Sequence, residues 1–314
     1  MIGLENTTCH RVRYLDPHAA QYTVFVYGAG TLEELVNPHD YTNLDTRLEP
    51  FCSAVSDREL TAWVDRLAAV DGVEQRARPD GSVTLAVRGL EFARTSSGTE
   101  LLFGIDERHA GGERHLAEIE DLALGLARMR CAGAGDRTNP LYLRHPEAWL
   151  ESQVRRSVSN LDATVRETPL YSQAPQFAAG VRGILDLLAV DYDGRLTVIE
   201  VKASQDIHLP LQALDYWMRV KWHLERNEFA GRGYFPGVPL RSDPPRLLLV
   251  APALDFHPTN ETILGYFAPE VQVERIGVGI EWRQELRVMF RAPAGTARAC
   301  LSGSLDKSSA RFRA

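Results

Sequence analysis

The chain has 314 residues, of which 44% are hydrophobic and 25% charged, and its net charge is −7. This composition is typical of a folded protein of about two domains, and it excludes collagen-like, fibrous and wholly disordered chains. The longest apolar runs, residues 184–190 and 247–253, fall far short of the ~20 residues that span a bilayer, and the amino terminus lacks the apolar core of a secretory signal. We therefore expect a cytoplasmic protein without membrane association.

The first half of the sequence is predicted to form a small α+β domain, residues 1–140. Its helix over 57–70 is expected to begin at Ser56, with Glu59 completing a capping box. Apolar residues at helical spacing predict a second helix over 113–130. Strands are predicted over residues 22–28, 82–95 and 100–105.

The stretch 132–140, AGAGDRTNP, favours irregular backbone and marks the expected domain boundary. A second domain is predicted over 141–290, with a tail at 291–314 that is small, polar and expected to be disordered. Its helices are expected over 146–161 and 209–224, and its strands over 170–172, 181–191, 195–203, 246–251, 271–280 and 286–290. The fold class predicted for the chain is α/β (α+β), with a central mixed sheet between helices.

The charge is distributed unevenly between the two halves. Residues 1–146 contain 15 Lys and Arg against 22 Asp and Glu, whereas residues 147–314 are balanced. The neutral second half can approach a polyanion through a local basic patch. The acidic first half instead favours a protein partner or a homodimer contact.

The motifs of several common classes of site are absent from the sequence. The four cysteines stand singly, without C-x-x-C spacing. There is no H-E-x-x-H pair for zinc and no G-x-x-x-x-G-K-[ST] phosphate loop. Classical zinc hydrolases and nucleotide-driven motors are therefore disfavoured.

Charged residues stand within two apolar strands of the second half. Asp186 lies in GILDLLAV, and Glu200 and Lys202 lie in TVIEVKA. A carboxylate among Leu and Ile costs several kcal/mol unless a partner or a cation compensates it. These positions therefore require compensation in the fold.

The register of the two strands decides whether these groups meet. A three-residue loop over 192–194, with Gly194 in the left-handed bulge position, pairs Asp191 with Arg195. Asp186 then lies opposite Glu200, and Lys202 shares their face because strand side chains alternate. A strict two-residue turn would instead place Asp186 opposite Val201.

Facing carboxylates repel each other, and a divalent cation reverses that repulsion. Mg²⁺, or Mn²⁺ in its place, prefers carboxylate and carbonyl oxygens. Asp186, Glu200 and the carbonyl of Val201 are therefore candidate metal ligands. Lys202 beside them could orient or deprotonate a water and neutralise phosphoryl charge.

This pattern, with Asp186 fourteen residues before the Glu200-Val201-Lys202 triplet and a preceding helix that bears Glu151, resembles the PD-(D/E)xK nuclease superfamily. The resemblance implies a restriction-endonuclease-like core, metal ligation by Asp186, Glu200 and the Val201 carbonyl, and a further acidic group at Glu151. Leu185 stands where the family motif has proline. The resemblance covers residues 146–252 and says nothing about the first 140.

Gln212 and Tyr216 extend the resemblance, because they stand at i and i+4 on the next helix. Several exonuclease branches of the superfamily carry a Q-x-x-x-Y motif there, so both residues are candidate catalytic residues. The function implied is a metal-dependent hydrolysis of nucleic-acid phosphodiester bonds, with DNA favoured over RNA.

Two other hypotheses remain open from the sequence. The nuclease-like fold could be a catalytically silent module that binds nucleic acid or assembles with proteins. Alternatively, the first half could hold the activity, although no catalytic grouping is visible there. The individual residues also have ordinary structural interpretations: Glu151 as a solvent-facing helix residue, and Gln212 and Tyr216 as polar residues bordering a core helix.

Overall fold

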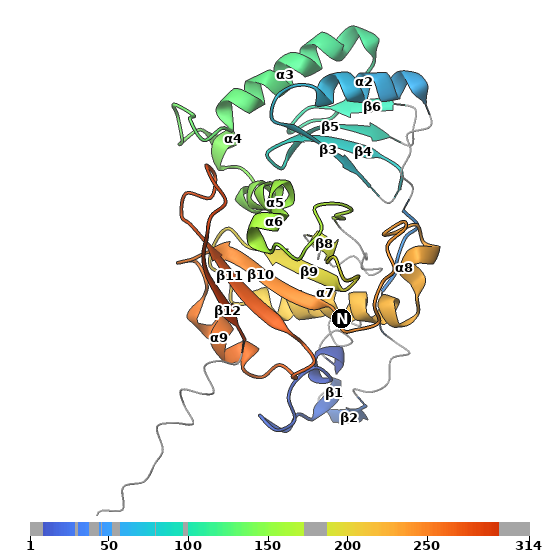
Figure 1. Cartoon of the computed structure of the whole chain (residues 1–314), viewed down its shortest axis with the longest axis vertical. Coiled ribbons are helices and arrows are strands. Elements are labelled where there is room, and N and C mark those ends of the chain that lie inside the picture. Colours follow the sequence, from blue (N-terminus) through green and yellow to red (C-terminus); the bar gives the residue numbers. More distant parts are fainter. Residues whose placement is uncertain are drawn as a thin grey trace, which may run out of the picture.

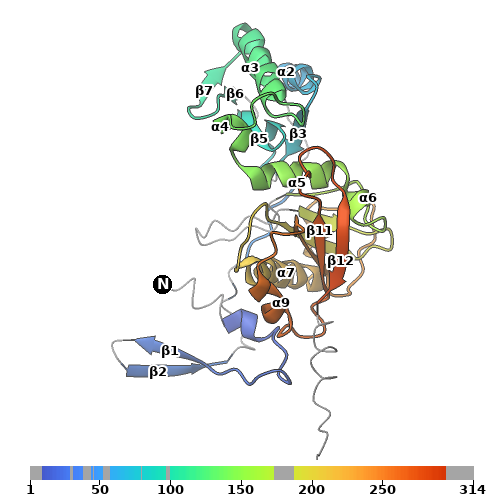
Figure 2. The same ribbon diagram turned by 90° about the vertical axis from the view of Figure 1, so that its left-hand side faces the viewer.

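The computed structural model describes residues 9–28, 31–37, 44, 46–51, 57–78, 80–96, 100–172 and 187–294. Mixed α and β structure surrounds two five-stranded sheets, and a two-stranded hairpin stands apart from both (Figures 1 and 2). None of the helices in these ranges is long and apolar enough to cross a bilayer.

The larger core is a mixed sheet in the order β12-β11-β10-β9-β8. β9 and β11 run parallel to the central strand β10, and the two edge strands run antiparallel to their neighbours. The strands are β8 (Leu187–Val190), β9 (Leu196–Val201), β10 (Arg246–Pro252), β11 (Val273–Val278) and β12 (Val288–Pro293). The sheet predicted for the second half is thus present, and it is mixed as expected.

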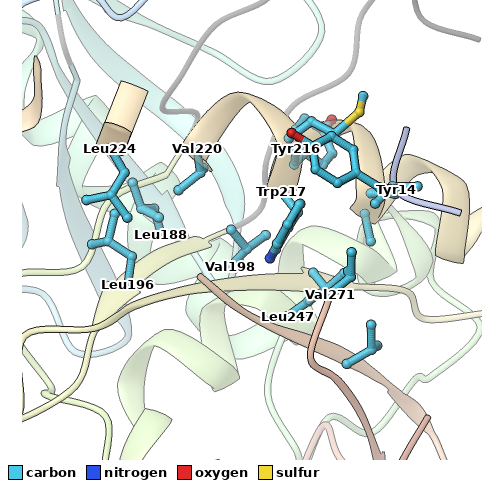
Figure 3. Close-up of a cluster of buried hydrophobic side chains, with 14 of the residues drawn as sticks. Tyr14, Leu188, Leu196, Val198, Tyr216, Trp217, Val220, Leu224, Leu247 and Val271 are labelled. Atoms are coloured by element: carbon cyan, nitrogen blue, oxygen red, sulfur yellow. The ribbon is translucent and has the colours of Figure 1, made fainter. Parts of the chain in front are cut away.

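Helices cover both faces of this sheet. On one face, α7 (Leu209–Glu225) packs against Val198 of β9 and Leu247 of β10, and Trp217 lies between helix and strands (Figure 3). On the other face, α5 (Pro146–Arg156) and α6 (Val158–Leu161) pack against Ile199 and Val201. The strands are apolar on both faces for this reason, as expected for parallel strands between two helical layers.

The second sheet is antiparallel throughout, in the order β3-β4-β5-β6-β7, and α2 and α3 lie over it (Figure 1). Its elements are α2 (Arg58–Ala68), β3 (Val73–Ala77), β4 (Val83–Val87), β5 (Leu90–Ser96), β6 (Glu100–Phe103), β7 (His109–Gly111), the short 3-10 helix η1 (Glu113–His115) and α3 (Leu116–Met129). The predicted helices and the strands β4, β5 and β6 are found, whereas β3 and β7 were not predicted.

The cap of α2 differs from the prediction. Asp57 is the N-cap, and its carboxylate accepts hydrogen bonds from the backbone N–H groups of Glu59 and Leu60, at 2.8 and 3.1 Å. Ser56 lies outside the described residues. Both residue types are good N-caps, so the pattern alone could not choose between neighbouring positions.

Residues of the predicted domain 1–140 contribute to more than one core. The hairpin of β1 (Val24–Gly28) and β2 (Thr31–Val36) lies at the opposite end of the molecule from β3–β7 (Figures 1 and 2). Tyr14 and Leu48 are buried in the core beneath α7. Apolar contact with the second half outweighs proximity along the chain, and a local sequence pattern carries no sign of such a long-range contact.

The remaining differences concern short elements and the tail. Residues 291–293, predicted to begin a disordered tail, end β12 instead, where Arg291 pairs with Ile276 of β11. Residues 295–314 lie outside the described part. The short helices α4 (Pro140–Leu143), α8 (Glu228–Gly231) and α9 (Pro258–Leu264) were not predicted as separate elements.

The β8–β9 hairpin has the predicted register. The backbone N–H of Asp191 donates to the carbonyl of Arg195 at 2.9 Å, and Leu187 pairs with Ile199. Gly194 has a φ of +88°, in the left-handed region that favours glycine. A Cβ at this position would lie 2.1 Å from the carbonyl oxygen of Pro239, so the loop leaves no room for a side chain.

We predict that Gly194→Ala lowers the free energy of unfolding by about 2 kcal/mol or more, because the left-handed conformation and the overlap with Pro239 both penalise a Cβ. The matched control is Gly231→Ala, where no atom lies within 4 Å of an added Cβ. Chemical denaturation of both variants tests this, and equal stabilities would contradict it.

Asp162, just after α6, ties together strands that lie on either side of β11. Its carboxylate accepts hydrogen bonds from the side chains of Arg246 in β10 and Arg291 in β12, the latter at 3.0 Å. Burial alone would raise the pKa of Asp162, but hydrogen bonds from Thr164 and the Arg246 guanidinium hold it well below its usual value.

Because the folded-state pKa is depressed, Asp162 stabilises the fold above the unfolded-state pKa of about 3.9, and the stabilisation is lost as the pH falls below it. We predict that Asp162→Asn is less stable than wild type at pH 7 and that this difference narrows at pH 3. Urea denaturation at both values, with the exposed Asp121→Asn as control, tests the sign; a difference that widens in acid would refute it.

Candidate active site

The candidate site begins at the carboxyl end of β9. Glu200 is 3% exposed and lies next to Leu249 of the parallel strand β10. Ile199 and Val201 belong to the core beneath α5, whereas Val198 belongs to the core beneath α7. By the alternation of a strand, Glu200 lies on the α7 side, opposite to Ile199 and Val201. A carboxylate is therefore held between apolar layers at the point where the strand ends.

Lys202 directly follows β9, and its backbone N–H donates to the carbonyl of Val250 at 2.9 Å. Its ammonium lies 3.8 Å from the Glu147 carboxylate on α5 and 3.6 Å from that of Asp206 in the loop before α7. The side chain is 16% exposed. Carboxylates from α5 and from the loop before α7, on opposite faces of the sheet, thus both approach the Lys202 ammonium at the end of β9.

Asp186 lies outside the described residues, so its predicted position opposite Glu200 stays a prediction. The described register stops one residue later, at the pair Leu187 and Ile199.

Glu151, on α5, is 9% exposed and is held by cations rather than by solvent. Nη1 of Arg76 donates to both of its oxygens, at 3.2 and 3.3 Å, and Nη2 of Arg155 approaches Oε1 at 3.4 Å. The hydroxyl of Ser172 donates to the same oxygen at 3.1 Å. The solvent-facing interpretation of Glu151 is therefore wrong.

The partners of Glu151 extend into the sheet β3–β7, referred to below as the N-terminal sheet. Arg76 belongs to β3 and also donates to Glu74 at 3.0 Å, and Glu74 in turn accepts a hydrogen bond from Ser152 of α5. Burial alone would lower the pKa of Arg76, but the carboxylates of Glu151 and Glu74 raise it above its usual value. The group is a buried network of two acids and two arginines between β3 and α5.

Gln212 and Tyr216 lie on α7, which packs against β9 on the side of Glu200. Tyr216 is 3% exposed and belongs to the core cluster beneath this helix (Figure 3). Gln212 is half-buried in the first turns of the helix, where its backbone N–H donates to the carbonyl of His208. The two residues share the helix that covers Glu200, and Tyr216 is also a packing residue.

The predicted metal ligands are not equally suited to binding a divalent cation. The Glu200 carboxylate and the Val201 carbonyl are hard oxygen donors of the kind that Mg²⁺ prefers. Both oxygens of Glu151 are engaged by arginines, so in this arrangement Glu151 has none free for a cation. Among the described residues, which exclude Asp186, no group of three or more His, Cys, Asp or Glu side chains is placed to hold a metal ion.

Comparison of the chain with models of protein families, with curated proteins and with solved structures gave no significant match.

Sequence analysis did not identify the residues that hold the candidate site residues in place. Glu147 stands four positions before Glu151, and Asp206 stands four positions after Lys202. On a helix this spacing places Glu147 on the same face as Glu151, so Glu147 could have been found from the sequence. Arg76 gave no local signal, because it lies 75 positions before its partner Glu151.

We predict that Arg76→Met destabilises the protein by about 3 kcal/mol or more, because removing one partner leaves buried carboxylates uncompensated. The control is Arg66→Met, since Arg66 is half-exposed and pairs with Glu120 at 2.7 Å, a surface pair worth less than about 1 kcal/mol. Denaturation midpoints measure both. A loss no greater than that of the control would show that the network contributes little.

Proposed function

We propose that the chain is a divalent-metal-dependent nuclease that hydrolyses phosphodiester bonds, with DNA as the favoured substrate. The observation that carries the proposal is the placement of Glu200 and Lys202 at the end of a strand buried on both faces, in a hairpin with the register that the sequence motif requires. A buried acid followed by a partly exposed ammonium suits a site that handles phosphate and water rather than a packed core.

The order of elements supports the same proposal. A helix, an edge segment that pairs through Tyr171 with β8, the antiparallel β8 and β9, a helix and the parallel β10 follow one another around the site. This is the order expected from the resemblance to the PD-(D/E)xK superfamily over residues 146–252. The restriction-endonuclease-like core is part of the proposal.

In the proposed mechanism, Asp186, Glu200 and the carbonyl of Val201 would hold Mg²⁺ or Mn²⁺. When bound, the cation polarises the phosphodiester and makes water more acidic. Lys202 orients the attacking water and neutralises charge on the phosphoryl oxygens as it develops. The resemblance implies products with 5′-phosphate and 3′-hydroxyl ends.

The neighbours of Lys202 determine where its ammonium lies. Glu147 and Asp206 approach it from two sides at 3.8 and 3.6 Å, which restricts the long side chain to the end of β9. Both carboxylates attract the ammonium and so favour this position of the side chain. In this position Lys202 neutralises a phosphate and positions water through its N–H groups.

A second function, a catalytically silent nucleic-acid-binding or assembly module, is favoured by one observation. Glu151 is neutralised by Arg76 and Arg155, so the helical acid of the motif serves the contact between β3 and α5. A chain that had lost catalysis could keep such a network for its stability alone.

Purified wild type is expected to cleave DNA in the presence of Mg²⁺ or Mn²⁺, and Lys202→Ala or Glu200→Gln is expected to lower the rate by at least ~100-fold. Single-stranded DNA, duplex DNA and RNA are compared as substrates. Lys221→Ala is the matched control, because Lys221 pairs with Glu225 at 2.5 Å on the same helix as Gln212, away from the end of β9.

Equal rates for wild type and Lys202→Ala on every substrate would remove the nuclease proposal. Binding of DNA by wild type without metal-dependent cleavage would support the silent module instead. Melting temperatures of all variants separate a catalytic effect from a loss of fold.

A further inference from the structure

A cavity of about 400 Å³ lies where the N-terminal sheet meets α5, α6 and the segment between β11 and β12. In Figure 1 that segment reaches past α5 and α6 toward the N-terminal sheet. The polar side chains that line the cavity include three arginines, three amides and a hydroxyl: Arg88, Arg156, Arg283, Gln153, Asn160, Gln284 and Ser157. The cavity thus collects positive charge from three separate parts of the chain.

The elements around the cavity are firmly joined. Arg88 and Gly89 form the turn between β4 and β5, and a Cβ at Gly89 would lie 2.0 Å from the carbonyl oxygen of Ala148 on α5. Gln153 donates to the carbonyls of Trp282 and Arg283, each at 3.2 Å. The turn and the β11–β12 segment are therefore both fixed against α5, and these contacts hold the walls of the cavity in place.

Within the described ranges, Arg88, Arg156 and Arg283 form no ion pair. The guanidinium of Arg283 lies over the Trp282 ring at 4.2 Å, which orients it without neutralising it. Glu285 is the acidic residue of the lining, and it pairs with Arg287 at 3.1 Å.

A fourth arginine behind the lining adds to the positive charge. Arg130 is fully buried and donates to the backbone carbonyls of Leu141, Arg144 and Arg88. Burial, together with Arg283 and Arg88, lowers its pKa to about 10. Burial also lowers the pKa of Arg88, and Arg156 lowers it further. These guanidinium groups repel one another.

An anion in the cavity would relieve this repulsion, since it compensates several guanidinium groups at once. Arginine forks match the oxygens of phosphate, and amide and hydroxyl groups supply further hydrogen bonds. The volume falls in the range of small-ligand sites. Ala132 and Leu286 offer little apolar surface, which favours a phosphate group over a base or an acyl chain.

We infer that this cavity is a binding site for a phosphate group, carried either by a small phosphorylated ligand such as a nucleotide or by a nucleic-acid strand. Arg156 and Arg283 contact the phosphate oxygens from opposite elements, and Arg88 contributes from the hairpin turn. The inference goes beyond the proposed hydrolysis, because it requires neither a metal nor Lys202.

The test measures binding of inorganic pyrophosphate by calorimetry and of a fluorescent single-stranded oligonucleotide by anisotropy, without divalent metal and at constant ionic strength. Arg156→Gln is the main variant, because Arg156 is exposed and its replacement removes no buried contact. Arg287→Gln is the control, because Arg287 stands beside the cavity but does not line it. Arg283→Gln is a second lining variant.

We expect pyrophosphate to bind wild type and Arg287→Gln alike, and to bind Arg156→Gln roughly tenfold more weakly, the effect of one charge-assisted hydrogen bond. A parallel loss of oligonucleotide binding assigns the site to a nucleic-acid strand, and unchanged oligonucleotide binding assigns it to a small ligand. Wild type that does not bind pyrophosphate, or equal weakening in Arg287→Gln, would overturn the inference. Each outcome is independent of cleavage.

Discussion

The ion-pair network around Glu151 is the interaction on which the arrangement of the molecule depends. A carboxylate that is 9% exposed must be compensated, and its compensation comes from Arg155 on its own helix and from Arg76 on the other sheet. Burying any one of these charged side chains without its partners would be strongly unfavourable. The network therefore fixes the N-terminal sheet against α5. The close contact of Gly89 with Ala148 joins the same two parts.

Helix α5 consequently links three regions with different chemistry. Glu147 in its first turn faces Lys202 at the end of β9, Glu151 one turn later faces Arg76, and Arg156 in its last turn lines the arginine cavity. Residues that would hold phosphate and residues that would cut it are thus carried by, or held against, one rigid element. Rigid elements position such groups more accurately than loops do.

The sequence predicted those parts of the structure whose causes are local. The hairpin loop at Gly194 set the register of β8 and β9, and apolar spacing located α7 and β10, because turn chemistry and periodicity act over a few residues. It could not find Arg76 as the partner of Glu151, nor the burial of Tyr14 beneath α7. Both are contacts between distant parts of the chain, decided by packing rather than by neighbours.

The candidate site likewise contains residues that a local pattern could assign and one whose partners it could not reveal. Glu200 and Lys202 could be assigned from alternation along one strand, and Glu200 lies on the face opposite to Ile199 and Val201. Glu151 was assigned from its position on a helix, which does not reveal what faces that helix. Its pairing with Arg76 depends on β3, a strand that the sequence pattern did not indicate.

The parallel pairing of β10 with both β9 and β11 has a consequence for folding during synthesis. The sheet β3–β7 pairs only neighbouring strands, so it can form as soon as it leaves the ribosome. The second sheet must wait until the crossover helices α7 and α9 have emerged. α5 emerges before either of these helices, and until it does Arg76 can pair with Glu74 of its own strand, as it does at 3.0 Å in the folded protein.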